Sequence, residues 1–279
     1  MKIRVIVFLC GLILLITPVL QAQEKGKSAE EVARELANPN TPLATLNFKL
    51  QFRRFEGSLP GANSQNGTTV LFQPSLPFPL DNGDLLLWRP AIPLIVDQPV
   101  FSGTGFDGES GIGDIVFDLA YAPKNESGLL IAYGIIASLP TATDDKLGSD
   151  RFTLGPEYLI GKLTPTYVIG AFPNHQWDIG GSGNKSISLT SVQLFGTILP
   201  GGGWNYGTSP IITYDWETDQ ATIPLNFNFG KTVIRGSTPW KLSMEFNYYV
   251  EQADAFGPEW MIGLNISPVV KNGLVGWFK

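Results

Sequence analysis

The 279-residue sequence has one cysteine and one histidine, and each scarcity excludes a class of chemistry. Cys10 lies in an apolar N-terminal run, so the rest of the chain has no disulfide, thiolate metal site or cysteine nucleophile. His175, in "FPNHQWD", is the one histidine available to a catalytic triad, and we interpret it as an outer-loop residue. The sequence also lacks GxSxG, HExxH and P-loop motifs. We therefore predict no catalytic residue, no metal site and no cofactor.

The N-terminus has the pattern of a secretory signal peptide. Lys2 and Arg4 precede an apolar run, and Leu20-Gln21-Ala22 offers a small residue for cleavage. The run is shorter than the about 20 residues of a spanning helix, although an uncleaved anchor is the alternative. The lack of cysteine after it favours a bacterial envelope protein over a secreted eukaryotic domain. We predict a signal peptide at 1–22, a periplasmic leader at 23–43 and an outer-membrane barrel at 44–279.

Charge is scarce as well. Asp, Glu, Lys and Arg make up 16% of the chain, against about 25% in ordinary soluble proteins. The formal net charge of −6 argues against nucleic acid as a partner. No apolar run of about 18 residues occurs after the signal, which argues against a helical membrane span. In contrast, the chain has 31 glycines and 11% aromatic residues. An exported chain of this composition indicates a transmembrane β-barrel.

The leader contains a short helical pattern. Ser28 and Glu31 have the spacing of a capping box, and Val32 and Leu36 lie on one helical face. Asn38-Pro39 ends the pattern. The sequence leaves open whether this helix is free in the periplasm or lodged against the barrel mouth.

After the leader the apolar period changes to two. In "ATLNFKLQFRRFEG" (44–57), leucines and phenylalanines alternate with polar residues. The predicted strands are 45–56, 67–78, 84–97, 112–122, 128–139, 152–163, 165–175, 186–199, 204–214, 221–231, 240–251 and 257–269. Long and short connections alternate over most of the chain, as in a barrel with outer loops and short periplasmic turns. We predict an all-β, antiparallel transmembrane barrel of about twelve strands, preceded by a short helix, with tryptophans and tyrosines near the strand ends forming a girdle.

Proline is the feature that fits a barrel least. Pro74, Pro90, Pro156 and Pro224 fall inside predicted strands, where each removes a hydrogen-bond donor from the ladder. Kinks could open the wall laterally or inward. Alternatively, the strands are shorter and the prolines mark their rims.

The polar sides of the strands are expected to line the lumen. The alternation assigns to the lumen or substrate pathway Lys49, Arg53, Arg89, Asp114, Asp118, Glu157, Asn226, Asn228, Lys241 and Glu245. Apolar residues are expected beside them, and such a mixed lining suits a narrow channel or a cavity for a small, partly apolar solute. The alternative is that inward ion pairs only fill and brace a closed barrel.

The glycine-rich stretch 102–114 offers Asp107, Glu109 and Asp114 as oxygen ligands, but their spacing is not that of an EF-hand. As a nucleotide loop it fails, because a strand rather than a helix follows. We interpret the stretch as a long loop that turns back tightly on its glycines.

Two segments resemble a known family. "GIGDIVFDLAYAP" (111–123) and "SLPTATDDKLGSDRFTLGPEYLIG" (138–161) are similar to the outer-membrane proteins named for the meta-pathway of phenol degradation, often described as transporters. The resemblance extends loosely over residues 28–270. It implies a barrel related to channels that admit small hydrophobic or aromatic compounds, and it brings no catalytic residues. The tail departs from the usual pattern, because Lys279 follows the terminal aromatic Phe278 that the barrel assembly machinery would recognise. Either the final strand runs later than expected, or one strand is miscounted.

The hypothesis from the sequence is a bacterial outer-membrane channel for small hydrophobic or aromatic solutes. Its expected partners are outer-membrane lipid, the barrel assembly machinery and that solute. The alternatives are a structural or adhesion barrel acting through its outer loops, an envelope enzyme that uses His175, and a soluble periplasmic β-protein.

Overall fold

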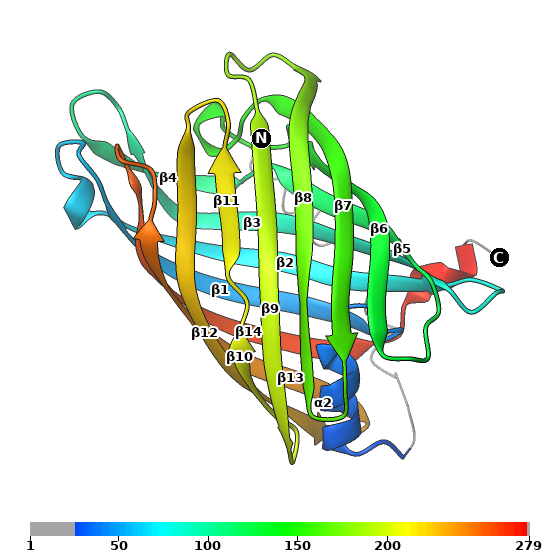
Figure 1. Ribbon diagram of the computed structural model, residues 1–279. Helices are drawn as coiled ribbons and strands as arrows, with labels where there is room; N and C mark the ends of the chain where they lie inside the picture. The colour runs from blue at the N-terminus through cyan, green and yellow to red at the C-terminus, as the bar shows by residue number, and fades with distance from the viewer. Residues whose placement is uncertain (1–25, 278–279) are drawn as a thin grey trace.

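The computed structural model describes residues 26–277 and consists mainly of long antiparallel strands (Figure 1). The helices are α2 (Ala29–Ala37) and three 3-10 helices at Ala62–Ser64, Asp145–Leu147 and Gly273–Trp277. The strands are β1 (Ala44–Glu56), β2 (Asn66–Pro79), β3 (Leu85–Phe101), β4 (Phe106–Ile112), β5 (Ile115–Ala122), β6 (Leu129–Leu139), β7 (Arg151–Leu163), β8 (Tyr167–Gly181), β9 (Ser188–Gly201), β10 (Trp204–Thr208), β11 (Ile211–Asp215), β12 (Gln220–Arg235), β13 (Thr238–Glu251) and β14 (Gly257–Val270). The predicted signal peptide and the last two residues lie outside the described residues.

The strands close into an antiparallel barrel of twelve wall strands. β14 pairs with β13 on one side and with β1 on the other, which closes the sheet. Two wall strands are each made of two pieces: β4 and β5 both pair with β3, and β10 and β11 both lie between β9 and β12. The predicted fold class is therefore confirmed. The final strand ends at Val270, so the tail does not extend it.

The outer surface of the barrel is a belt of large apolar side chains at alternate strand positions. Those that are exposed include Phe48, Phe52, Tyr133, Ile135, Ile160, Ile169, Leu225, Phe227, Phe246 and Ile262. Soluble monomers rarely expose contiguous apolar patches larger than a few hundred Å². A wall with alternating apolar and polar faces, closed so that every strand is paired, is the arrangement that lipid requires.

Pro74, Pro90, Pro156 and Pro224 lie inside strands, so the alternative in which they mark strand rims is wrong for them. Pro74 and Pro90 lie where the ladder between β2 and β3 is interrupted. Pro210 and Pro224 lie in a second interruption, between the β10/β11 strand and β12. A proline has no N–H to donate, which explains why pairing stops at these positions.

The two ends of the barrel differ in their connections. At one end the chain turns through residues 57–65, 102–105, 140–150, 182–187, 216–219 and 252–256. At the other end it turns through 80–84, 123–128, 164–166, 202–203 and 236–237. We call these the long-loop end and the short-turn end. In outer-membrane barrels the short turns face the periplasm.

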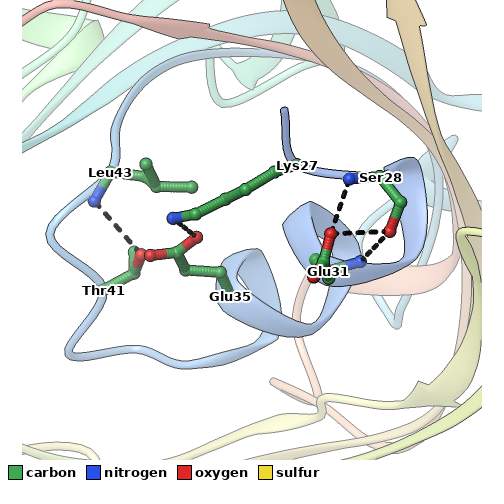
Figure 2. Close-up of polar contacts among 6 residues, drawn as sticks. All are labelled: Lys27, Ser28, Glu31, Glu35, Thr41 and Leu43. Carbon is green, nitrogen blue, oxygen red and sulfur yellow. Dashed lines mark hydrogen bonds and ion pairs between the residues drawn. The ribbon is translucent and has the colours of Figure 1, made fainter. Parts of the chain in front are cut away.

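Helix α2 begins with the predicted capping box (Figure 2). The Glu31 backbone N–H donates to Ser28 Oγ at 3.2 Å, and the Ser28 N–H donates to Glu31 Oε2 at 2.7 Å. The Ser28 N–H and the Ser28 hydroxyl both donate to the Glu31 carboxylate, which lowers the pKa of Glu31 below its ordinary value. Lys27, which precedes the helix, pairs with Glu35 in the last turn of the helix, at 2.8 Å. The helix end is therefore well defined although the helix has only nine residues.

The short-turn end also holds α2 (Figure 1). Val32, 1% exposed, packs against Leu43 and against the inward-facing Val269 of β14. At the other end of the helix, Ala37 packs on a cluster of inward-facing residues from β3, β5, β6, β7 and β8. The helix therefore crosses the mouth from one side of the wall to the other, which favours the lodged alternative over the free one. None of the helices among residues 26–277 is long and apolar enough to span a membrane.

Candidate functional site

The polar residues that alternate with the apolar belt face the lumen, as an ion pair between two non-adjacent strands demonstrates. Arg89 on β3 forms an ion pair with Glu157 on β7. The β4/β5 strand and β6 separate these two strands in the wall. Side chains that far apart around a closed barrel meet only across its interior. Positions with the same parity on neighbouring strands share this face, as the registers show.

Arg89 forms the centre of a closed ionic cluster. Its Nε donates to Asp118 Oδ1 at 2.7 Å, and its Nη2 donates to Glu157 Oε1 at 3.1 Å. The guanidinium carbon also lies 4.9 Å from the ring centroid of Phe172 on β8. The two carboxylate side chains are only 12% and 7% exposed. Charge-assisted bonds of this kind are strong where water is largely excluded. We call these three charged residues the Arg89 cluster.

A layer of small and aliphatic side chains lies next to the Arg89 cluster toward the short-turn end. It consists of Leu87, Ala120, Ala122, Leu130, Ala132, Leu159 and Val168. All of them are inward-facing and buried, and they pack with Ala37 of α2. These residues are not among the polar residues predicted to line the lumen. In the sequence, the layer could have been found only from the alanines at alternate strand positions on the polar side: Ala120, Ala122 and Ala132.

The part of the wall formed by β1, β14 and β13 carries lumenal lysines without carboxylate partners. Lys49 of β1 lies in register with Asn265 of β14, and Lys241 of β13 lies in register with Ser267, two positions along β14. Among residues 26–277, neither lysine has an ion-pair partner. Glu245 is the nearest acidic neighbour, but its chain lies flat against β14, since a Cβ on Gly263 would be 2.6 Å from its Cγ. We call Lys49 and Lys241 the lysine pair.

The other polar candidates on this side bond to the wall. Arg53 donates to Gln51 Oε1 at 2.6 Å and to Thr69 Oγ1 at 3.4 Å. Near Pro210, where backbone pairing between the β10/β11 strand and β12 is interrupted, Asn226 Oδ1 accepts a hydrogen bond from the Ser209 N–H at 2.6 Å. Its Nδ2 donates to Asn247 Oδ1 at 2.8 Å, while Asn228 Nδ2 donates to the Oδ1 of Asn226 at 3.3 Å. The Asn226–Ser209 bond joins β12 to the β10/β11 strand where the backbone ladder is interrupted, whereas Asn226 and Asn247 lie in register on paired strands.

Asp114 lies apart from the lumenal charges, at the break between β4 and β5. Its Oδ1 accepts the N–H groups of Thr141 and Ala142, both at 3.1 Å. Its Oδ2 accepts the N–H and hydroxyl of Ser149 at 2.7 and 2.9 Å. The four bonds hold the 140–150 loop against the wall at the long-loop end, which is a structural role.

The glycine-rich stretch forms a β3–β4 hairpin that projects at the long-loop end, rather than one long loop. Lys146 pairs with Glu109 there, which raises the lysine pKa above its ordinary value. No group of histidines, cysteines and acids arranged to hold a metal ion occurs in the described part of the chain.

His175 is not in a loop, so that prediction is wrong. It lies inside β8, in register with Thr190 of β9, and its parity puts the ring on the outer surface. Its Nδ1 lies 2.8 Å from Thr190 Oγ1, its Nε2 lies 3.5 Å from Ser188 Oγ, and it contacts Trp177. Trp216 Nε1 also donates to Thr190. The cluster belongs to an aromatic girdle near the long-loop end, and within residues 26–277 no carboxylate bonds to the imidazole ring.

Two solved structures have an architecture similar to that of this chain. The crystal structure of the COG4313 outer membrane channel from Pseudomonas putida F1 matches with a TM-score of 0.62 and 13% sequence identity, covering 82% of this chain and 96% of that one. The fold is that of an outer-membrane barrel. The NanC porin matches with a TM-score of 0.50 and 9% identity, covering 81% of this chain and 99% of the porin. No protein-family model matches this chain. No curated protein matches its sequence either.

Proposed function

We propose that this barrel is a bacterial outer-membrane channel that admits small hydrophobic or aromatic molecules by passive passage through its lumen. The short-turn end faces the periplasm in this proposal, and lipid covers the apolar belt. Selectivity comes from the width of the lumen and from its fixed charges, without covalent chemistry. The barrel assembly machinery inserts the chain, as for other outer-membrane barrels.

The observation that carries the proposal is the mixed lining of the lumen. The Arg89 cluster and the lysine pair bring charge into the lumen, and a buried aliphatic layer around Leu87 and Leu159 lies next to the Arg89 cluster. An aliphatic layer would not help a wide pore conduct ions or sugars. In a barrel whose lumen is only filled and braced by ion pairs, the lysines would be expected to have carboxylate partners. A lining that mixes charged and apolar side chains suits a small solute with an apolar body.

Two further findings support the proposal. The fold likeness to structures described as an outer membrane channel and a porin agrees with a transport role. The resemblance of residues 111–123 and 138–161 to the phenol meta-pathway group favours aromatic solutes. Helix α2 limits passage at the short-turn end, because it crosses the mouth there.

The test is electrical, because small hydrophobic molecules cross lipid unaided and bulk leakage would be uninformative. Purified protein is inserted into planar bilayers, and single-channel current is recorded before and after adding phenol or a size-matched sugar alcohol. We expect steady ion current with brief interruptions that depend on phenol concentration. Bilayers that stay tight after confirmed insertion would overturn the channel proposal, and equal effects of both additives would overturn the aromatic preference.

A second candidate function is an adhesion barrel, and the ordered long-loop end favours it. Asp114 and the Lys146–Glu109 pair hold the 140–150 loop in one conformation, as a binding surface requires. Neutralising Arg53 and Glu245 distinguishes the two functions. Changed current supports the channel, whereas unchanged current in a barrel whose surface binding depends on the loops supports adhesion.

An interfacial hydrolase is the remaining alternative, because Ser188 lies near His175 on the lipid side. Without a carboxylate on the imidazole, this pair has no group that stabilises a protonated ring. The His175→Ala variant is assayed with phospholipid in mixed micelles. Any lipid hydrolysis by the unaltered protein that this variant loses would contradict the non-enzymatic proposal.

A further inference from the structure

The lumenal charges around the lysine pair do not balance locally. Lys49 and Lys241 come from strands on either side of β14, and their electrostatic interaction with each other is repulsive. Lys49 also lies within electrostatic range of Glu245 and of Arg89 on β3, from which only β2 separates its strand. Arg89 is already neutralised by two carboxylates, and Glu245 lies against β14 out of ion-pairing distance. Two cations therefore face one space with no direct counter-charge.

A second and independent feature lies between these lysines. Asn265 is the β14 residue in register with Lys49, and its amide Oδ1 is buried without a hydrogen-bond partner. Buried polar atoms without partners are uncommon in folded proteins and call for an explanation. The O and N of an amide exchange by rotation, so the same group can present its N–H₂ to an acceptor. With the amide rotated in this way, its N–H₂ can donate to an anion held between the lysines.

The neighbouring wall is apolar on the same face. Lys49 lies in register with Leu71 of β2, and Leu71 lies in register with Pro93 of β3. Their parity turns both side chains toward the lumen. A ligand bound through an anionic group at the lysines therefore has apolar surface beside it for a ring or a short alkyl chain. Bare inorganic anions would leave this surface unused.

Resting on the channel function proposed above, we propose that Lys49, Lys241 and Asn265 form a lumenal binding site for the carboxylate of a small aromatic or aliphatic acid, with Leu71 and Pro93 against its apolar body. The two ammonium groups and the amide N–H₂ donate to the carboxylate oxygens. The site allows weak organic acids to pass through the channel in their ionised form. Such ions, unlike their neutral counterparts, cannot cross the lipid without a protein.

The test compares benzoate with benzamide, a neutral molecule of the same shape. Binding of each to the detergent-solubilised full chain is measured by isothermal titration calorimetry. We expect benzoate to bind at least about tenfold more tightly, since charge-assisted bonds are worth about 1.5–3 kcal/mol each and 1.4 kcal/mol is a factor of ten. Raising the salt concentration weakens benzoate binding and leaves benzamide unchanged. Equal affinities, or no binding of benzoate, would overturn the site without any variant being needed.

Variants locate the site. Lys49→Gln and Lys241→Gln each lower benzoate affinity about tenfold, because each removes one charge-assisted bond, and the double variant abolishes its preference over benzamide. Lys162→Gln is the matched control, because Lys162 is an exposed lysine on the outer face of β7. A heat-modifiable gel shift confirms that each variant is a folded barrel. Benzoate preference that survives the double variant, or is lost equally in Lys162→Gln, would contradict the assignment.

The reversal potential in a potassium chloride gradient separates this inference from the channel function itself. The unaltered protein favours chloride over potassium, and the double variant loses that preference while keeping its conductance. A conducting barrel without benzoate preference overturns the carboxylate site and leaves the channel intact. A barrel that binds benzoate selectively but carries no current overturns the channel and leaves the site intact.

Discussion

Arg89 on β3 and Lys241 on β13 both bring a cation into the same lumen, yet only Arg89 meets carboxylates there. Arg89 bonds to Asp118 and Glu157 at 2.7 and 3.1 Å. Lys241 lies in register with Thr232 and Ser267, neither of which carries charge. The rigid guanidinium suits a fixed pair of carboxylates, whereas an ammonium on a flexible stem remains adaptable. One side of the lumen is therefore braced, and the other is available to a ligand.

The largest expected effect comes from breaking the braced side. Arg89→Ala leaves two buried carboxylates without a cation, which costs about 3–5 kcal/mol of unfolding free energy. Urea unfolding of the barrel in detergent, followed by tryptophan fluorescence, measures the loss. Lys241→Gln is the comparison, and we expect it to change the unfolding midpoint little, because Lys241 has no ion pair to lose.

A triple variant tests whether the loss arises from unpaired charge. Arg89→Met combined with Asp118→Asn and Glu157→Gln removes all three charges together. We expect it to recover much of the stability, because no carboxylate is then left without its partner. A triple variant as unstable as Arg89→Ala would show that packing against Phe172, rather than charge pairing, is what the cluster contributes.

A smaller effect is expected from Glu157→Gln. This variant removes one of the two carboxylates of the Arg89 cluster and leaves Arg89 paired with Asp118 alone. The lumen then has one negative charge fewer, so chloride preference increases and the reversal potential in a salt gradient shifts toward the chloride value. Glu217→Gln, in the connection between β11 and β12, is the matched control at a position outside the wall. Equal shifts in the two variants would mean that surface charge, not the lumen, sets selectivity.

The contrast between the two sides was only partly predictable from the sequence. Period-two alternation put Lys49, Arg89 and Glu157 on the polar face, because side-chain direction in a strand depends only on parity. Which charges meet depends on the order and tilt of strands around the closed wall. Arg89 and Glu157 are far apart in the sequence and on strands that are not adjacent, so no local pattern joins them.

Asp114 and His175 show two further limits of sequence patterns. Asp114 has the expected alternation but lies at a strand break, where its side chain bonds to a loop thirty residues on. His175 lies two residues after Pro173, at the end of the predicted strand 165–175. The strand instead continues to Gly181, because its neighbour β9 keeps pairing with it beyond Pro173. Tertiary pairing overrides a local breaker when the partner strand supplies the register.

Helix α2 connects the two sides, and a single substitution should release it. Val32→Asp puts a charge into the contact with Leu43 and Val269, which destabilises docking without touching the wall. We expect faster amide hydrogen exchange over residues 29–37 and a larger single-channel conductance, because the mouth is no longer crossed. Arg34→Asp, at an exposed position on the same helix, should change neither quantity. Faster exchange with unchanged conductance would mean that α2 does not limit passage.

The smallest expected effect is a pH dependence at the short turns on the Arg89 side. Asp84 accepts the Lys124 N–H at 2.7 Å and the Tyr121 hydroxyl, and these bonds hold its pKa below the ordinary value. Since the folded pKa is the lower one, the stability from Asp84 is complete above the unfolded value of about 3.9 and disappears as the pH falls through the folded value. Unfolding midpoints of the unaltered barrel should therefore decline below about pH 4. Asp84→Asn, which cannot titrate, should reduce that decline, whereas a decline of the same size in both proteins would assign it to other carboxylates.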